Sequence, residues 1–125
     1  MFRMRLSKWD IETQVFQQIN RKFNADVRGL LPRITPGHNK CTKIHGPAFT
    51  VKSVPIDDTT SPKIEGHWID KVRPGSVIVI SQPEPHFVAM VGGILAARAK
   101  YLGAKGIIID GYFRDVEEIE NMEIP

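Results

Sequence analysis

The chain has 125 residues and a net charge of +3, with 42% hydrophobic and 25% charged residues. These values are typical of one soluble globular domain with a sizeable core, and they exclude two full domains. No apolar run approaches the roughly 20 residues of a membrane span, and the basic N-terminus lacks the apolar stretch of a secretory signal. The single cysteine, Cys41, excludes an intramolecular disulfide and indicates a reducing compartment, so we expect a cytoplasmic protein without a membrane partner.

Charge is distributed unevenly along the chain. Residues 1–40 hold eight Lys or Arg and three acidic residues, whereas residues 110–125 hold one Arg and six acidic residues. The N-terminal basic residues are scattered through a predicted helix and loop, without interleaved aromatic residues or a nucleic-acid-binding motif. A solvated surface explains them better than a nucleic-acid partner, which we do not expect.

The first half of the chain predicts one helix and one strand. Apolar residues recur at every fourth position over residues 10–23, which indicates an amphipathic helix. Residues 24–46 are interrupted by glycine and proline and predict a loop. Polar and apolar residues alternate over 48–54, as in a strand that the following proline ends. A polar connection over 56–63 and a weak helix over 64–72 follow.

The second half alternates strand and helix. Buried strands are predicted over 76–81 and 107–109, and helices over 88–102 and 115–121, with Gly103 capping the first helix. This alternation predicts right-handed βαβ connections. We therefore expect an α/β fold, a layered sheet that contains parallel strands.

Two short motifs in this half carry candidate chemistry. Gly92-Gly93 would open a helix whose N-terminal amides can hold an anion, although close packing of helix on sheet explains the pair better when it is taken alone. Arg114-Asp115 follows the 107–109 strand at its carboxyl end, where open α/β sheets bind ligands. Arginine can clamp a carboxylate and aspartate can bind a hard cation, but a surface ion pair that caps the next helix explains the pair equally well.

Other polar groups carry weaker signals. The four histidines lack the spacing of a zinc site, and the pattern contains neither a dinucleotide-binding fingerprint nor a phosphate-binding loop. Asp57-Asp58 lies in a polar loop, where a turn is the better explanation. Glu117, Glu118 and Glu120 are expected to match the dipole of the last helix.

Four segments are informative when they are taken together: residues 46–55, 72–80, 92–96 and 106–115. In combination they resemble the RraA-like family, and most closely its fungal members. That family includes class II 4-hydroxy-4-methyl-2-oxoglutarate aldolases, which also decarboxylate oxaloacetate, and a bacterial regulator of ribonuclease E activity. The resemblance covers residues 44–125 of a single domain, while residues 1–43 match the family poorly.

The resemblance implies a fold, a cofactor and a site. The implied fold is the swivelling β/β/α domain of the family, in trimers or larger rings. The residues that would bind the substrate carboxylate, largely through backbone amides, are Gly92, Gly93, Ile94 and Leu95. Arg114 would contact the pyruvyl carboxylate and keto oxygen, and Asp115 would ligate Mg²⁺ or Mn²⁺. The metal and the arginine would together stabilise a pyruvate enolate.

The chain departs from the family pattern in two ways. Twenty-one positions before Arg114, where the aldolases carry an acid, this chain has Gly93, which has no side chain to orient a proton-removing water. Oxaloacetate decarboxylation needs no such base, so Gly93 alone predicts that decarboxylation survives better than aldol cleavage. The family also continues into further strands, whereas this chain stops at residue 125, so we expect a C-terminal truncation.

The leading prediction is thus a divalent-metal-dependent carbon–carbon lyase acting on oxaloacetate or a 4-hydroxy-2-oxo acid, in a homotrimer or larger ring. The alternatives are a non-catalytic, ring-forming interaction module like the ribonuclease regulator, and an inactive truncated paralogue. Gly93 and the missing C-terminal region favour the alternatives, while the intact Arg114-Asp115 pair favours the enzyme.

Overall fold

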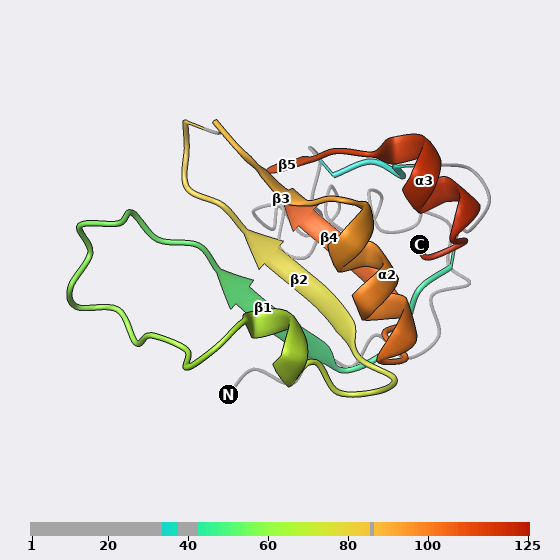
Figure 1. Cartoon of the computed structure of the whole chain (residues 1–125), viewed down its shortest axis with the longest axis horizontal. Coiled ribbons are helices and arrows are strands. Elements are labelled where there is room, and N and C mark those ends of the chain that lie inside the picture. Colours follow the sequence, from blue (N-terminus) through green and yellow to red (C-terminus); the bar gives the residue numbers. More distant parts are fainter. Residues whose placement is uncertain (1–33, 38–42, 86) are drawn as a thin grey trace, which may run out of the picture.

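The computed structural model describes residues 34–37, 43–85 and 87–125, so the helix predicted over 10–23 lies outside the described residues. Figure 1 shows the arrangement of their helices and strands. The elements in chain order are β1 (Ala48–Lys52), the 3-10 helix η1 (Trp68–Lys71), β2 (Val77–Ser81), β3 (Ala89–Val91), α2 (Gly93–Tyr101), β4 (Gly106–Asp110), β5 (Tyr112–Phe113) and α3 (Val116–Asn121).

The central layer is a three-stranded parallel sheet in the order β1-β2-β4. Val77 of β2 pairs with Ala48 of β1 on one side and with Gly106 of β4 on the other. Ile78 and Ile80 of this middle strand are fully buried. The continuous apolar run of β2 is the pattern of a strand covered on both faces. Parallel strands with intervening helices confirm the predicted α/β class.

The two shortest strands, β3 and β5, form a separate parallel pair that the sequence pattern does not predict. The helix expected from residue 88 therefore begins only at Gly93, because residues 89–91 are extended. The helix expected from residue 115 begins at Val116, with Asp115 at its N-cap position. Gly103, with φ +79°, follows the C-cap of α2 and confirms the predicted helix end.

Helices α2, η1 and α3 pack together over the sheet (Figure 1). Two fully buried alanines, Ala96 and Ala99, allow α2 to approach the sheet closely. The buried core consists of Ile69, Val72, Ile78, Ile80, Val91, Ala96, Ala99, Ile119 and Ile124. None of the helices in the described residues is long and apolar enough to span a membrane.

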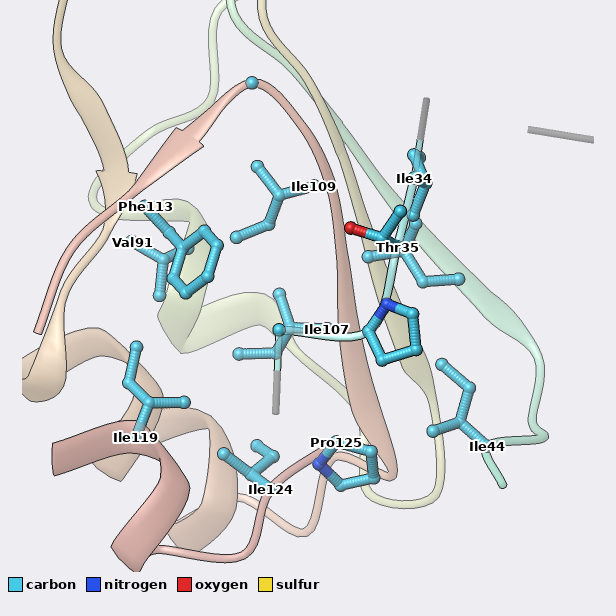
Figure 2. Close-up of a pocket in the computed structure, with 14 residues that line it drawn as sticks. Ile34, Thr35, Ile44, Val91, Ile107, Ile109, Phe113, Ile119, Ile124 and Pro125 are labelled. Atoms are coloured by element: carbon cyan, nitrogen blue, oxygen red, sulfur yellow. The ribbon is translucent and has the colours of Figure 1, made fainter. Parts of the chain in front are cut away.

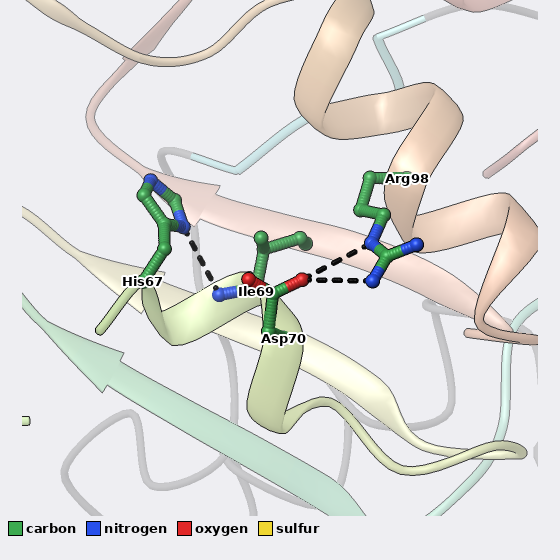
Figure 3. Close-up of polar contacts among 4 residues, drawn as sticks. All are labelled: His67, Ile69, Asp70 and Arg98. Carbon is green, nitrogen blue, oxygen red and sulfur yellow. Dashed lines mark hydrogen bonds and ion pairs between the residues drawn. The ribbon is translucent and has the colours of Figure 1, made fainter. Parts of the chain in front are cut away.

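The weak helix predicted over 64–72 is reduced to the single turn of η1. Its N-cap, His67, accepts a hydrogen bond at Nδ1 from the Ile69 amide, at 3.2 Å (Figure 3). Asp70 then ties η1 to α2: its Oδ1 accepts hydrogen bonds from Arg98 Nε and Nη2, at 3.1 and 2.9 Å (Figure 3). Both side chains are half-exposed, so this pair orients η1 more than it stabilises the fold.

Asp58 organises the polar connection after β1, in the turn role predicted for this loop. Its Oδ2 accepts from the Ser61 hydroxyl at 2.6 Å, and its Oδ1 accepts from the Ser61 and Thr60 amides at 3.0 and 2.8 Å. These hydrogen bonds, that of the Ser61 side chain first, hold the pKa of the Asp58 carboxyl well below its usual range.

Candidate active site

The parallel pairing of β3 with β5 brings the two candidate motifs together. Val91, the last residue of β3, pairs with Phe113, the last residue of β5. Gly92-Gly93 and Arg114-Asp115 directly follow these two residues, so both motifs leave the same end of one ladder. The Arg114 amide also donates to the Val91 carbonyl at 3.0 Å. The prediction that Arg114-Asp115 follows β4 directly needs correction, because Gly111 and β5 lie between them.

Gln82, which the sequence analysis does not single out, aligns these two strands. This buried side chain donates from Nε2 to the Val88 carbonyl at 2.9 Å and accepts at Oε1 from the Tyr112 amide at 3.1 Å. It therefore connects the starts of β3 and β5. Gly111 lies close beside it, since a Cβ at residue 111 would stand 2.4 Å from Gln82 Oε1.

Asp115 links the two motifs through its side chain. Its Oδ2 accepts a hydrogen bond from the Gly93 amide at 2.9 Å and lies 3.6 Å from Arg114 Nε. Although Asp115 occupies the N-cap position of α3, its side chain makes no capping bond there and instead satisfies the first amide of α2. Its backbone is left-handed, with φ +62° and ψ +42°, a conformation that aspartate and asparagine tolerate better than other non-glycine residues.

The glycine pair leaves room for the charged side chains. A Cβ at Gly92 would stand 2.7 Å from Asp115 Oδ2 and 3.0 Å from Arg114 Nε. A Cβ at Gly93 would stand only 2.0 Å from Glu118 Oε2 and 2.7 Å from its Oε1. The carboxylate of Glu118 thus fills the space beside Gly93. From the sequence, this residue is expected only to match the dipole of α3.

Ile94 and Leu95 complete the first turn of α2. Their amides belong to the positions that have no intrahelical acceptor, whereas the Gly93 amide already donates to Asp115. The Ile94 side chain is 86% exposed, so this turn lies at the surface beside the exposed Arg114. Two amides without an intrahelical acceptor and an exposed guanidinium therefore lie at one end of the β3–β5 ladder.

A divalent cation would find few protein ligands here. Within the described ranges, no three His, Cys, Asp or Glu side chains gather to form a metal cluster. Mg²⁺, however, is usually held by one or two carboxylates and several waters. Asp115 fits that mode, because 41% of its side chain is exposed and both of its contacts named above use Oδ2 rather than Oδ1.

A pocket of about 460 Å³ lies apart from these charged groups. Figure 2 shows Ile107 and Ile109 of β4 facing Phe113, Ile119 and other apolar side chains across it. Among the residues that the structure describes, none that lines this pocket has a titratable side chain. These residues offer a small dianionic acid no charged partner, so the candidate site is the surface at Arg114 and Asp115.

The comparisons with known proteins identify the family and the fold. The family model described as RraA-like, Aldolase/RraA, matches residues 13–125. Its match begins before residue 44, and the division of the chain at that point stays a prediction. None of the curated proteins matches the chain.

Three solved structures resemble the fold. An uncharacterized protein from Pseudomonas syringae pv. tomato strain DC3000 is 32% identical, with a TM-score of 0.71 over 91% of this chain and 49% of that one. Streptomyces coelicolor RraAS2, described as an unusual member of the RNase ES inhibitor RraA protein family, is 24% identical, with a TM-score of 0.65 over 91% and 62%. A structure described as novel cellulases from gut-associated microbes is 28% identical, with a TM-score of 0.57 over 90% and 51%.

The chain spans between 49% and 62% of the length of these three structures. The family described in this way includes aldolases and decarboxylases as well as ribonuclease inhibitors. Because the family model matches nearly the whole sequence, the chain belongs to the RraA-like family.

Proposed function

We propose that this chain is a divalent-metal-dependent lyase that breaks a carbon–carbon bond next to a pyruvyl group. The substrates are oxaloacetate, which loses carbon dioxide, and 4-hydroxy-2-oxo acids such as 4-hydroxy-4-methyl-2-oxoglutarate, which undergo retro-aldol cleavage. The observation that carries the proposal is the register of β3 with β5, which sets Arg114 and Asp115 against the first turn of α2. Membership of a family that contains aldolases supports it.

The residues of this surface supply the binding that such a reaction needs. The amides of Ile94 and Leu95 would receive the carboxylate beside the keto group, since helix N-termini favour anions. Arg114, with 76% of its side chain exposed, would donate to the same carboxylate and to the keto oxygen. Asp115 would hold Mg²⁺ or Mn²⁺, which when bound supplies Lewis-acid stabilisation of negative charge on the substrate.

The charge distribution suits decarboxylation. When carbon dioxide leaves oxaloacetate, the electron pair of the broken bond passes to the pyruvyl fragment as an enolate, which then takes a proton from solvent. Arg114 would stabilise that developing charge, because its exposed side chain lies beside Gly92 at the start of α2. No protein base is required, because the carboxylate that leaves is already ionised.

Pyruvate release from oxaloacetate tests the proposal. Folded protein with Mn²⁺ is compared with a metal-only blank, with chelated protein, and with Arg114→Ala and Asp115→Ala. Arg98→Ala is the matched control, since Arg98 is also an exposed arginine but pairs with Asp70 on η1. We expect Arg114→Ala to lower kcat/KM about 10²- to 10³-fold, the usual loss for one oxyanion donor, and Arg98→Ala to leave it within about twofold. Turnover no greater than the blank would refute the lyase.

The second candidate is a non-catalytic interaction module. It is favoured by the likeness to Streptomyces coelicolor RraAS2, which is described as a member of an RNase ES inhibitor family, and by the absence of a side chain at Gly93. The same experiment separates the two, because a binding module has no need for Mn²⁺. A folded protein with neither turnover nor measurable Mn²⁺ affinity would favour the module.

A further inference from the structure

Gly93 and Glu118 occupy complementary positions across the interface of α2 and α3. Gly93 is buried in the first turn of α2, and an added Cβ would stand within 2.7 Å of both carboxylate oxygens of Glu118. The space that a side chain at residue 93 would fill therefore already holds an acid, supplied by the neighbouring helix. The side chain of Glu118 is flexible. Its carboxylate or a side chain introduced at residue 93 can therefore occupy that space, but not both at once.

Glu118 and Asp115 approach the same residue with different atoms. Asp115 Oδ2 accepts the hydrogen bond of the Gly93 amide, whereas Glu118 lies on the side where the Gly93 side chain would project. One carboxylate is thus tied to the backbone and also lies near Arg114. The other lies beside a glycine, so no side chain of residue 93 occupies the space around its oxygens.

We propose that Glu118 is the proton-accepting residue for aldol cleavage at this site. The inference rests on the proposed lyase function and revises the expectation drawn from Gly93 alone. The Glu118 carboxylate takes the hydroxyl proton on C4 of a 4-hydroxy-2-oxo acid. The C3–C4 bond then breaks, C4 becomes the carbonyl carbon of one product, and the electron pair forms the pyruvate enolate. The proton held on Glu118 returns to C3 and yields pyruvate.

Comparing the two substrates distinguishes a proton-accepting role of Glu118 from a structural role, because a structural defect would lower both activities. Decarboxylation needs no base, whereas aldol cleavage does. We expect Glu118→Gln to lower aldol cleavage of 4-hydroxy-4-methyl-2-oxoglutarate about 100-fold, the lower range for general acid–base catalysis, while oxaloacetate decarboxylation stays within about twofold. Glu117→Gln, which changes another exposed acid of the same turn, should change neither rate.

Two further variants test whether the Glu118 carboxylate and a side chain at residue 93 compete for the same space. Gly93→Asp should lower Tm at least about 2 °C more in the wild-type background than in Glu118→Ala, because two carboxylates would compete for one position. Gly93→Asp/Glu118→Ala should recover aldol cleavage relative to Glu118→Ala, since the acid returns from α2. The Tm comparison needs neither metal nor substrate.

The outcomes separate this inference from the proposed function. Wild-type protein that decarboxylates oxaloacetate but does not cleave the aldol substrate overturns the role of Glu118 and leaves the lyase. Equal losses of both activities in Glu118→Gln would also overturn the role of Glu118 and leave the lyase. The absence of a loss in either activity would lead to the same conclusion. Absence of both activities in the wild type overturns the lyase and Glu118 together.

Discussion

Replacing Asp115 by asparagine, glycine or alanine separates its part in folding from its proposed part in metal binding. The wild-type side chain accepts the Gly93 amide at Oδ2, at 2.9 Å, and its residue is left-handed with φ +62°. Asparagine keeps an acceptor oxygen and tolerates this backbone. Glycine loses the acceptor but adopts the backbone freely, and alanine loses both advantages. The proposed ligand of the metal is the charged carboxylate, which none of the three retains.

The expected stabilities follow from these differences. Loss of one half-exposed hydrogen bond to a carboxylate destabilises the protein by about 1 kcal/mol, and a left-handed alanine adds about 1 to 2 kcal/mol. For a domain of this size, about 1 kcal/mol corresponds to roughly 4 °C in Tm. We therefore expect Asp115→Asn within about 2 °C of the wild type, Asp115→Gly about 4 °C lower, and Asp115→Ala about 8 to 12 °C lower.

Metal binding should not follow that order. Even the loss of an outer-shell partner lowers metal affinity about 10- to 100-fold, so all three variants should lose more than about 100-fold in Mn²⁺ affinity by titration calorimetry. Asp115→Asn is decisive, since it is expected to be stable without binding the metal. If it bound Mn²⁺ as tightly as the wild type, Asp115 would not be the ligand. If glycine and alanine variants melted together, the argument from the left-handed backbone would be wrong.

Two further predictions concern residues outside the site. Gln82→Leu should lower the free energy of unfolding by about 2 to 3 kcal/mol, because the Val88 carbonyl and the Tyr112 amide both lose their hydrogen bond to Gln82. Thermal denaturation measures this loss, and an unchanged Tm would contradict the aligning role of Gln82. The lowered pKa of Asp58 means that its stabilising contribution is complete at neutral pH and is lost as pH falls through that pKa. In an NMR titration the Asp58 carboxyl should titrate below the usual range for aspartate and move upward in Ser61→Ala, whereas a midpoint in the usual range would rule out the hydrogen-bond argument.

The long, strongly patterned elements could be predicted from the sequence. The apolar run of β2, the glycine after α2 and the short run of β4 each contain a local signal strong enough to indicate an element. The pair β3 and β5 contains three and two residues, too few for an alternating pattern to be recognised. Gln82 and the parallel pairing connect two segments that lie about twenty residues apart in the chain. The residues of either segment alone do not indicate such a contact.

The residues of the candidate site also divide into those that the sequence indicates and those that it does not. The sequence indicates Arg114 and Asp115 by their position after a strand and by the family resemblance, although that strand is β5 rather than β4, and their role stays a prediction. It does not indicate Glu118, because an acid in the first turn of a helix is adequately explained by the helix dipole. The one available signal was indirect. A family position that normally holds an acid holds Gly93 here, and this raises the question of which other residue fills the space.

That question also changes how the glycine pair is understood. From the sequence, close packing of helix on sheet and binding of an anion are two separate explanations, but the atoms nearest to an added Cβ belong to charged side chains rather than to a sheet strand. They belong to Asp115 and Arg114 at Gly92, and to Glu118 at Gly93. A methyl group at Gly92 would displace the carboxylate of Asp115, which is hydrogen-bonded to the Gly93 amide, and one at Gly93 would displace the flexible carboxylate of Glu118. The two glycines therefore chiefly determine where three charged side chains can lie. Such an arrangement of charges is better explained by a binding or catalytic site than by the needs of folding.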